Sequence, residues 1–139
     1  MPSQTAEHAL RAVVYLADRD GERPLSADRL AQALGAPANY LSKTLHALAR
    51  AGILRSTTGR RGGFSLARPA DRIPLATVLA VFDEPPGERL CLLRDRACDG
   101  TSPCRVHPVW TRVRQARRAP LTGTTVGDLL RSGPCTPVA

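Results

Sequence analysis

The chain has 139 residues, of which 42% are hydrophobic and 23% charged, an ordinary composition for one globular domain with its own core. Its formal net charge of +8 favours a polyanionic partner, either nucleic acid or an acidic membrane surface. No apolar run approaches the roughly 20 residues that span a bilayer, and no secretory signal opens the chain, so the sequence predicts a cytoplasmic protein that does not enter membranes.

The first 51 residues predict three helices. Apolar residues recur at helical spacing over residues 3–18. A second helix begins after Ser26, a favourable N-cap, and ends at Gly35. The short turn GAPAN separates it from a third helix over residues 38–51. Two short helices joined by a tight turn that contains glycine are typical of a helix-turn-helix.

A β-hairpin is predicted directly after the third helix. The segments GILRSTT and FSLA are strand-like, and GRRGG between them predicts a turn. A hairpin in this place is the wing of a winged-helix domain. A further helix is predicted to begin near Pro74, because proline is tolerated at the first helical position.

The C-terminal part predicts two more helices. Pro108 opens a helix of about 12 residues that Pro120 closes, and Thr125 caps a last short helix with Asp128 three residues on. The predicted fold class is therefore mainly α with a small β-hairpin. The predicted units are a winged helix-turn-helix domain, a cysteine-rich loop, a pair of C-terminal helices, and a tail, over residues 1–85, 86–107, 108–132 and 133–139.

Polar side chains cover the predicted exposed face of the third helix, opposite its buried leucines. The N-terminal part of a recognition helix meets base edges in the major groove. Basic residues are concentrated between Ser42 and Leu75, and the wing tip carries two arginines able to enter a minor groove. The alternative is a solvated basic face without a ligand. The predicted DNA-binding residues are Ser26, Asn39, Tyr40, Ser42, Lys43, Arg50, Arg60 and Arg61.

Several segments together resemble a known family. ALRAVVYLA, LAQALGAPANYLSKTLHALARAGIL, GRRGGFSLARPADRI and the cysteine-rich segment are similar to the IscR/NsrR family of bacterial winged-helix transcription regulators, over residues 5–130. The resemblance implies a homodimer, paired through the helix after the cysteines, on a palindromic operator in double-stranded DNA. An apolar stripe of Val109, Val113 and Ala116 on that helix agrees with such pairing. In many members three cysteines hold an iron–sulfur cluster that controls DNA affinity.

Three closely spaced cysteines, Cys91, Cys98 and Cys104, are followed by His107. Thiolates are the usual ligands of iron–sulfur clusters, and histidine can replace one of them. Zinc also accepts three cysteines and a histidine, although structural zinc sites usually contain a tight C-x₂₋₄-C knuckle that is missing here. A thiol switch would need only two cysteines. Cys135, near the C-terminus, is predicted to be a bystander.

The identity of the fourth ligand divides the family. In the IscR branch a histidine follows the third cysteine, which implies His107. In the NsrR branch an N-terminal carboxylate of the partner subunit serves, which implies Glu7, with His8 beside it. The spacing between Cys91 and Cys98 leaves both a [2Fe-2S] and a [4Fe-4S] cluster open.

The sequence thus predicts a homodimeric transcription regulator, a repressor, whose iron–sulfur cluster senses redox state, nitric oxide or iron–sulfur status. The alternative is a metal-free regulator of the same family, controlled by its thiols or by a partner protein. An enzyme is not expected, because the chain lacks a C-x-x-C motif, a glycine-rich nucleotide loop and a base paired with a nucleophile.

Overall fold

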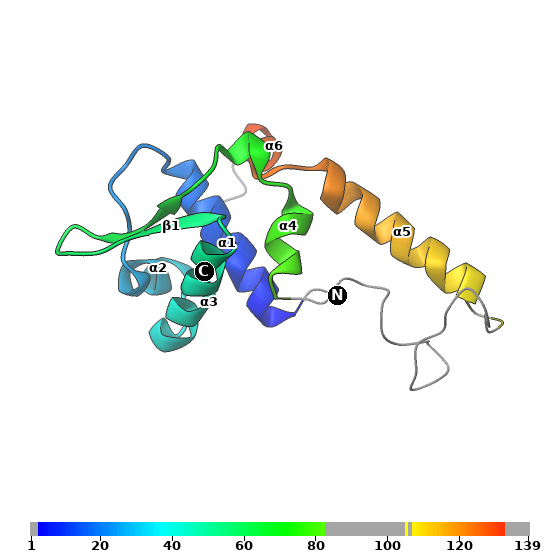
Figure 1. Ribbon diagram of the computed structural model, residues 1–139, viewed down its shortest axis with the longest axis horizontal. Coiled ribbons are helices and arrows are strands. Elements are labelled where there is room, and N and C mark those ends of the chain that lie inside the picture. The colour runs from blue at the N-terminus through cyan, green and yellow to red at the C-terminus, as the bar shows by residue number, and fades with distance from the viewer. Residues whose placement is uncertain (1–2, 83–104, 106, 133–139) are drawn as a thin grey trace.

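A computed structural model of the chain describes residues 3–82, 105 and 107–132. Within these residues the protein is mainly helical with one two-stranded antiparallel sheet, which confirms the predicted fold class (Figure 1). The elements are, in chain order, α1 (Gln4–Asp18), α2 (Ala27–Leu34), α3 (Ala38–Arg50), β1 (Leu54–Thr57), β2 (Gly63–Leu66), η1 (Ala70–Arg72), α4 (Leu75–Ala80), α5 (His107–Gly123) and α6 (Val126–Arg131).

One core joins the described elements, with α1 at its centre, and of the α5 side chains that the structure describes only the half-buried Leu121 contributes to it. Small alanines on the inner face of α1 are fully buried, so neighbouring helices approach it closely. The three leucines of α3 that the sequence assigns to the core are also fully buried. The largest fully buried side chains come from helices and connecting segments along the described chain and are Val13, Leu30, Leu41, Leu45, Leu48, Ile53, Ile73, Val78 and Val126.

Side-chain caps fix where the first two helices begin. The Ser3 Oγ accepts a hydrogen bond of 3.2 Å from the Ala6 N–H at the start of α1. The Ser26 Oγ accepts one of 3.3 Å from the Arg29 N–H at the start of α2, as the sequence predicts. Gly35 ends α2 in the left-handed conformation, with a φ of 65°.

Two helix boundaries are predicted at prolines: the one near Pro74 is confirmed, and the one at Pro120 was wrong. Pro74 is the N-cap of α4, and Leu75 is the first helical residue. Pro120 does not close α5 but lies inside it, and the helix continues to Gly123. Proline removes only one hydrogen bond from the last turns of a helix, and both Pro120 and Ala116 are exposed, so the carbonyl that loses its donor is accessible to water.

After α5 the chain returns to the winged-helix core (Figure 1). The Leu75 N–H donates to the Thr124 carbonyl over 2.9 Å, and the Val126 N–H donates to the Ile73 carbonyl over the same distance. The Val126 side chain has no exposed surface. The short helix α6 is therefore held both by core packing and by backbone pairing to the segment that precedes α4.

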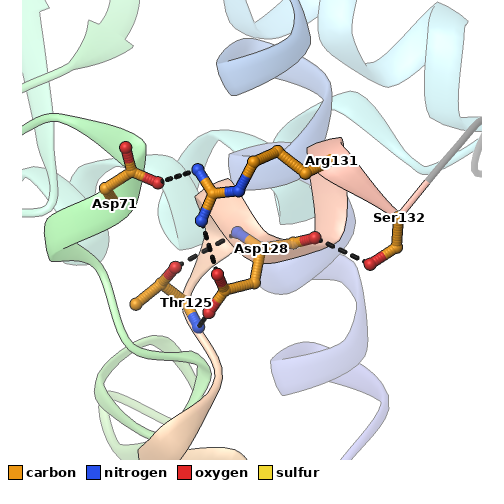
Figure 2. A network of polar contacts seen from close by, with 5 residues as sticks. All are labelled: Asp71, Thr125, Asp128, Arg131 and Ser132. Atoms are coloured by element: carbon orange, nitrogen blue, oxygen red, sulfur yellow. Dashed lines mark hydrogen bonds and ion pairs between the residues drawn. The ribbon is translucent and has the colours of Figure 1, made fainter.

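A network of polar side chains fixes α6, as Figure 2 shows. The Thr125 N–H donates to Asp128 over 2.9 Å and the Asp128 N–H donates to the Thr125 Oγ1 over 3.1 Å, which completes the predicted capping box. The Arg131 guanidinium contacts both Asp71 of η1 and Asp128 over 2.5 Å. Hydrogen bonds from the Thr125 backbone and side chain, and then from Arg131, lower the pKa of Asp128.

None of the helices that the structure describes is both long and apolar enough to cross a bilayer. The longest of these helices, α5, has 17 residues and carries several arginines.

Candidate nucleic-acid interface

The pair α2 and α3 forms the predicted helix-turn-helix. The Ala36 N–H donates to the Ala31 carbonyl over 3.0 Å as the chain leaves α2, and the Leu41 N–H donates to the Pro37 carbonyl over 2.9 Å as α3 begins. The turn between the two helices is therefore only three residues long. Since the leucines of both helices face the core, the opposite face of α3 is directed to solvent.

The polar residues assigned to DNA contact lie on this solvent face of α3. Asn39, Lys43 and Arg50 are exposed, and Ser42 is half-buried. His46, on the same helix, is also exposed, and its ring lies edge-on against Phe64 of β2, with centroids 5.1 Å apart. The His46 ring therefore contacts strand β2 of the wing.

Tyr40 differs from its neighbours on α3, because it faces α1. Its hydroxyl shares a hydrogen bond with the Thr5 Oγ1 in the first turn of α1. Its ring lies edge-on to the His8 ring, with centroids 5.8 Å apart and planes at 80°. Half-buried in this way, Tyr40 joins the first turns of two helices that are separated by more than 30 residues in the sequence.

The wing is a tight antiparallel hairpin, as predicted. Leu54 pairs with Leu66 at its base and Thr57 with Gly63 near its tip. Arg60 and Arg61 are exposed in the loop between the strands. This loop requires glycine at position 62, since a Cβ there would lie 2.1 Å from the Thr57 carbonyl oxygen.

The hairpin is fixed to the residues before α2 by an isolated antiparallel bridge between Leu25 and Phe64, which no periodic pattern in the sequence indicates. The Phe64 N–H donates to the Leu25 carbonyl over 2.8 Å, and the Leu25 N–H donates to the Phe64 carbonyl over 3.1 Å. At the other end of the hairpin, the Arg68 Nε donates to the Gly52 carbonyl over 3.2 Å. Arg68 is half-buried, so part of the basic character of this region is structural.

The charge of this region has one sign. No acidic residue occurs over residues 29–70, a stretch that contains most of α2, all of α3 and the wing. Its basic residues that are exposed come from each of these elements and are Arg29, Lys43, Arg50, Arg55, Arg60 and Arg61. An uncompensated basic surface on a helix-turn-helix and wing is the electrostatic arrangement expected for contact with phosphates.

The candidate cluster ligands are described only in part. Cys91, Cys98 and Cys104, as well as the bystander Cys135, lie outside the described residues. His107 is the first residue of α5, and Glu7 is exposed in the first turn of α1. Within residues 3–82, 105 and 107–132 no group of three or more His, Cys, Asp or Glu side chains is placed to hold a metal ion.

His8, the residue next to Glu7, already has contacts within its own protomer. Its Nδ1 lies 2.8 Å from the Gln4 carbonyl oxygen, and its ring packs against Tyr40. The His8 ring therefore takes part in the contact between α1 and α3.

An apolar stripe is exposed on α5. Val109 is 60% exposed to solvent and Val113 is 39% exposed, although valine is among the residue types most often buried in folded proteins. Ala116, one turn further on, is exposed as well. Residues four and three positions apart lie on one face of a helix, so these side chains form the continuous surface on which the dimer prediction depends.

Comparison with known proteins gives one consistent result. A sequence model of the Rrf2 family, described as iron-dependent transcriptional regulators, matches residues 2–132. An HTH-type transcriptional regulator of Aquifex aeolicus is 34% identical over 131 residues, which cover 92% of this chain and 90% of the relative. The Rrf2 protein of Nitratidesulfovibrio vulgaris is 28% identical over 132 residues, which cover 95% of this chain and 88% of the relative.

Solved structures agree with the sequence relatives. CymR, the global cysteine regulator of B. subtilis, superposes with a TM-score of 0.79 at 27% identity, over 96% of this chain and 98% of its own. IscR of T. potens superposes with a TM-score of 0.77 at 23% identity, over 100% of this chain and 92% of its own, which shows a shared fold.

Proposed function

The chain belongs to the Rrf2 family of DNA-binding transcription regulators, and on that basis we propose that it is a cytoplasmic, homodimeric repressor of a palindromic operator. The observation that carries the proposal is the exposed polar face of α3 beside a basic wing, in a stretch without acidic residues. In this arrangement α3 enters the major groove and the wing tip approaches the adjacent minor groove.

The proposed contacts divide into two kinds. Asn39, Ser42 and Lys43 lie near the start of α3 and contact base edges, because amide, hydroxyl and ammonium groups match the donors and acceptors of the major groove. Arg50 and the two arginines of the wing tip contact phosphates, which sets affinity and register without choosing sequence. Ser26, as the N-cap of α2, lies where a helix N-terminus can meet a phosphate.

The DNA contacts are tested with duplexes that the wild-type protein enriches from a random library. Arg60→Ala is expected to weaken binding to selected and unselected duplexes alike and to lower the slope of log K against log salt by about one. Arg11→Ala, an equally exposed arginine on α1, is the matched control and leaves both quantities unchanged. An unchanged salt slope in Arg60→Ala would show that the wing tip does not touch phosphate.

For the sensing function we propose that Cys91, Cys98 and Cys104 hold an iron–sulfur cluster. Three thiolates in one short polar segment are suitable donors for such a cluster, and the family description as iron-dependent supports it. When bound, the cluster supplies a redox- and nitric-oxide-sensitive group. The chain would complete the ligand set with His107, or with Glu7 of the opposite protomer.

A metal-free regulator is the second candidate, and the structural similarity to CymR, named as a cysteine regulator, favours it. Anaerobic purification followed by visible absorbance, iron and sulfide analysis separates the two. If a cluster is present, serine at Cys91, Cys98 or Cys104 removes the chromophore, whereas Cys135→Ser, the matched control, retains it. A colourless, iron-free protein that still binds DNA would support thiol control.

The fourth ligand is tested by His107→Ala and Glu7→Ala under the same conditions. We expect the His107 substitution to deplete the cluster more strongly. If Glu7 is the ligand, cluster retention depends on dimerisation, because the carboxylate comes from the other protomer. Full occupancy in both variants would exclude both residues.

A further inference from the structure

We infer that Tyr40 is a positioning residue for DNA recognition, which fixes the first turn of the recognition helix α3 against the first turn of α1 through Thr5. This inference rests on the proposed function, because it concerns how α3 is presented to DNA. It departs from a direct role of Tyr40 in base contact, since the hydroxyl that would contact DNA is already hydrogen-bonded to Thr5.

The first turn of α3 needs such a contact because it has no side-chain cap. Its N-cap residue is Pro37, which makes no capping hydrogen bond, whereas α1, α2 and α6 each have a serine or threonine cap. Uncapped first turns leave backbone N–H groups without partners and tend to fray. In α3 this turn carries Asn39, and the other proposed base contacts, Ser42 and Lys43, follow directly after it.

Tyr40 stabilises this turn at two points. Its hydroxyl is bonded to Thr5 and its ring packs edge-on against His8, so the side chain is held by two residues of α1. Its carbonyl accepts a hydrogen bond of 3.1 Å from the Thr44 Oγ1 one turn later. Thr44 is itself buried, so this bond links the first turn of α3 to a residue fixed in the core.

The other side of the contact is firmly placed as well. Thr5 lies in the first turn of α1, where the Ser3 Oγ accepts from the Ala6 N–H and the Ser3 carbonyl accepts from the Glu7 N–H over 3.0 Å. Beyond this turn, α1 is the central helix of the core. Thr5 is therefore a fixed point against which α3 can be oriented.

The contact of Tyr40 with α1 affects the positions of the neighbouring residues that are proposed to contact bases. Asn39 precedes Tyr40 in the first turn of α3, and Lys43 follows three positions later, at the start of the second turn. The backbone of the first turn sets the direction of the Asn39 side chain directly, and the turn that carries Lys43 continues from it. If that turn frays, the geometry needed for base-edge contacts is lost, while long-range attraction to phosphates is retained. The ratio of affinities for selected and unselected DNA is thus the quantity that Tyr40 controls.

The test uses the full-length protein and two probes, a duplex enriched by the wild-type protein from a random library and an unselected duplex of equal length. Tyr40→Phe and Thr5→Val each remove one hydroxyl while keeping the shape of the side chain. We expect each to lower the affinity ratio about fivefold, the worth of one net hydrogen bond, with unchanged binding to the unselected duplex. The double variant loses no more than either single one, and Thr5→Ser, which keeps the hydroxyl, restores the wild-type ratio.

The alternatives give different results. If Tyr40 contacts DNA directly, Tyr40→Phe lowers the ratio but Thr5→Val does not, which overturns the inference. If the variants lose the same affinity for the selected and the unselected duplex, Tyr40 and Thr5 have a purely structural role, and this result also overturns the inference. Thermal melting of each variant identifies loss of fold. If the wild-type protein enriches no duplex at all, the proposed function fails instead, so the two failures are distinguishable.

Discussion

The substitution Gly63→Ala tests how the wing is attached to the domain. Gly63 begins β2 with a φ of 155°, and a Cβ there would lie 2.5 Å from both the carbonyl carbon and the carbonyl oxygen of Leu25. These are backbone atoms that cannot rotate away as a flexible side chain does. We therefore expect β2 to move off Leu25, which breaks the two backbone hydrogen bonds between Leu25 and Phe64.

The loss in the free energy of unfolding caused by Gly63→Ala can be estimated from these contacts. Two buried hydrogen bonds contribute about 1 kcal/mol each, and an alanine in this backbone region adds about 1 kcal/mol of strain. We expect Gly63→Ala to lose about 3 kcal/mol in the free energy of unfolding. Gly59→Ala is the matched control, because Gly59 has a φ of 102° but nothing lies within 4 Å of its Cβ position. Only the strain of about 1 kcal/mol applies to it.

Urea denaturation at one fixed protein concentration measures both variants, since dimerisation makes stability depend on concentration. The difference of about 2 kcal/mol corresponds to a separation of about 1 M between the two urea midpoints at equal slope. The same distortion moves the wing relative to α3, so Gly63→Ala also binds selected DNA more weakly than Gly59→Ala does. Equal midpoints for the two variants would refute the attachment of β2 to Leu25.

Three further substitutions test other parts of the fold. Val113→Asp places a charge on the apolar stripe of α5 and yields monomers with weak operator binding, measured by analytical ultracentrifugation and gel shift. Val126→Ala removes a fully buried side chain and costs about 2 kcal/mol in a thermal melt. Because the pKa of Asp128 is lowered, its carboxylate stabilises the fold at neutral pH and this stabilisation is lost as the pH falls through the folded pKa. The stability gap between wild type and Asp128→Asn in urea titrations therefore stays constant above the ordinary aspartate pKa of about 4 and closes progressively as the pH falls below it.

Local signals explain why the winged helix could be predicted from the sequence. The serine cap at Ser26, the left-handed Gly35 and the leucines of α3 act within one or two turns of the chain, so short-range rules suffice to find them. The double glycine of the wing loop is another local signal, because the tight turn leaves no room for a side chain at Gly62. These elements in turn place the proposed DNA contacts.

Contacts between distant segments explain what the sequence could not predict. The pairing of Leu25 with Phe64 and the contact of Tyr40 with Thr5 each join segments more than 30 residues apart. Neither contact leaves a periodic pattern, and Tyr40 on the polar face of α3 has the same local appearance as a residue that contacts bases. The prediction that Pro120 ends α5 was wrong for a related reason. A helix can continue past a proline when the carbonyl four residues earlier, which loses its N–H donor, is accessible to water. The cysteine assignments remain predictions.

The two attachments of α5 bear on how a signal could reach DNA in the proposed regulator. At its C-terminal end, the return of the chain through Val126 and the contact of Arg131 with Asp71 fix α5 to the domain that carries α3 and the wing. At its N-terminal end, α5 follows directly on the segment of Cys91, Cys98 and Cys104 in the sequence. In the proposed regulator, a ligand held by these cysteines would therefore act at the N-terminal end of a helix whose C-terminal end is fixed to the domain. Since the same helix carries the proposed dimer contact, a change in its direction alters the separation of the two recognition helices, and with it the match to the half-sites of an operator.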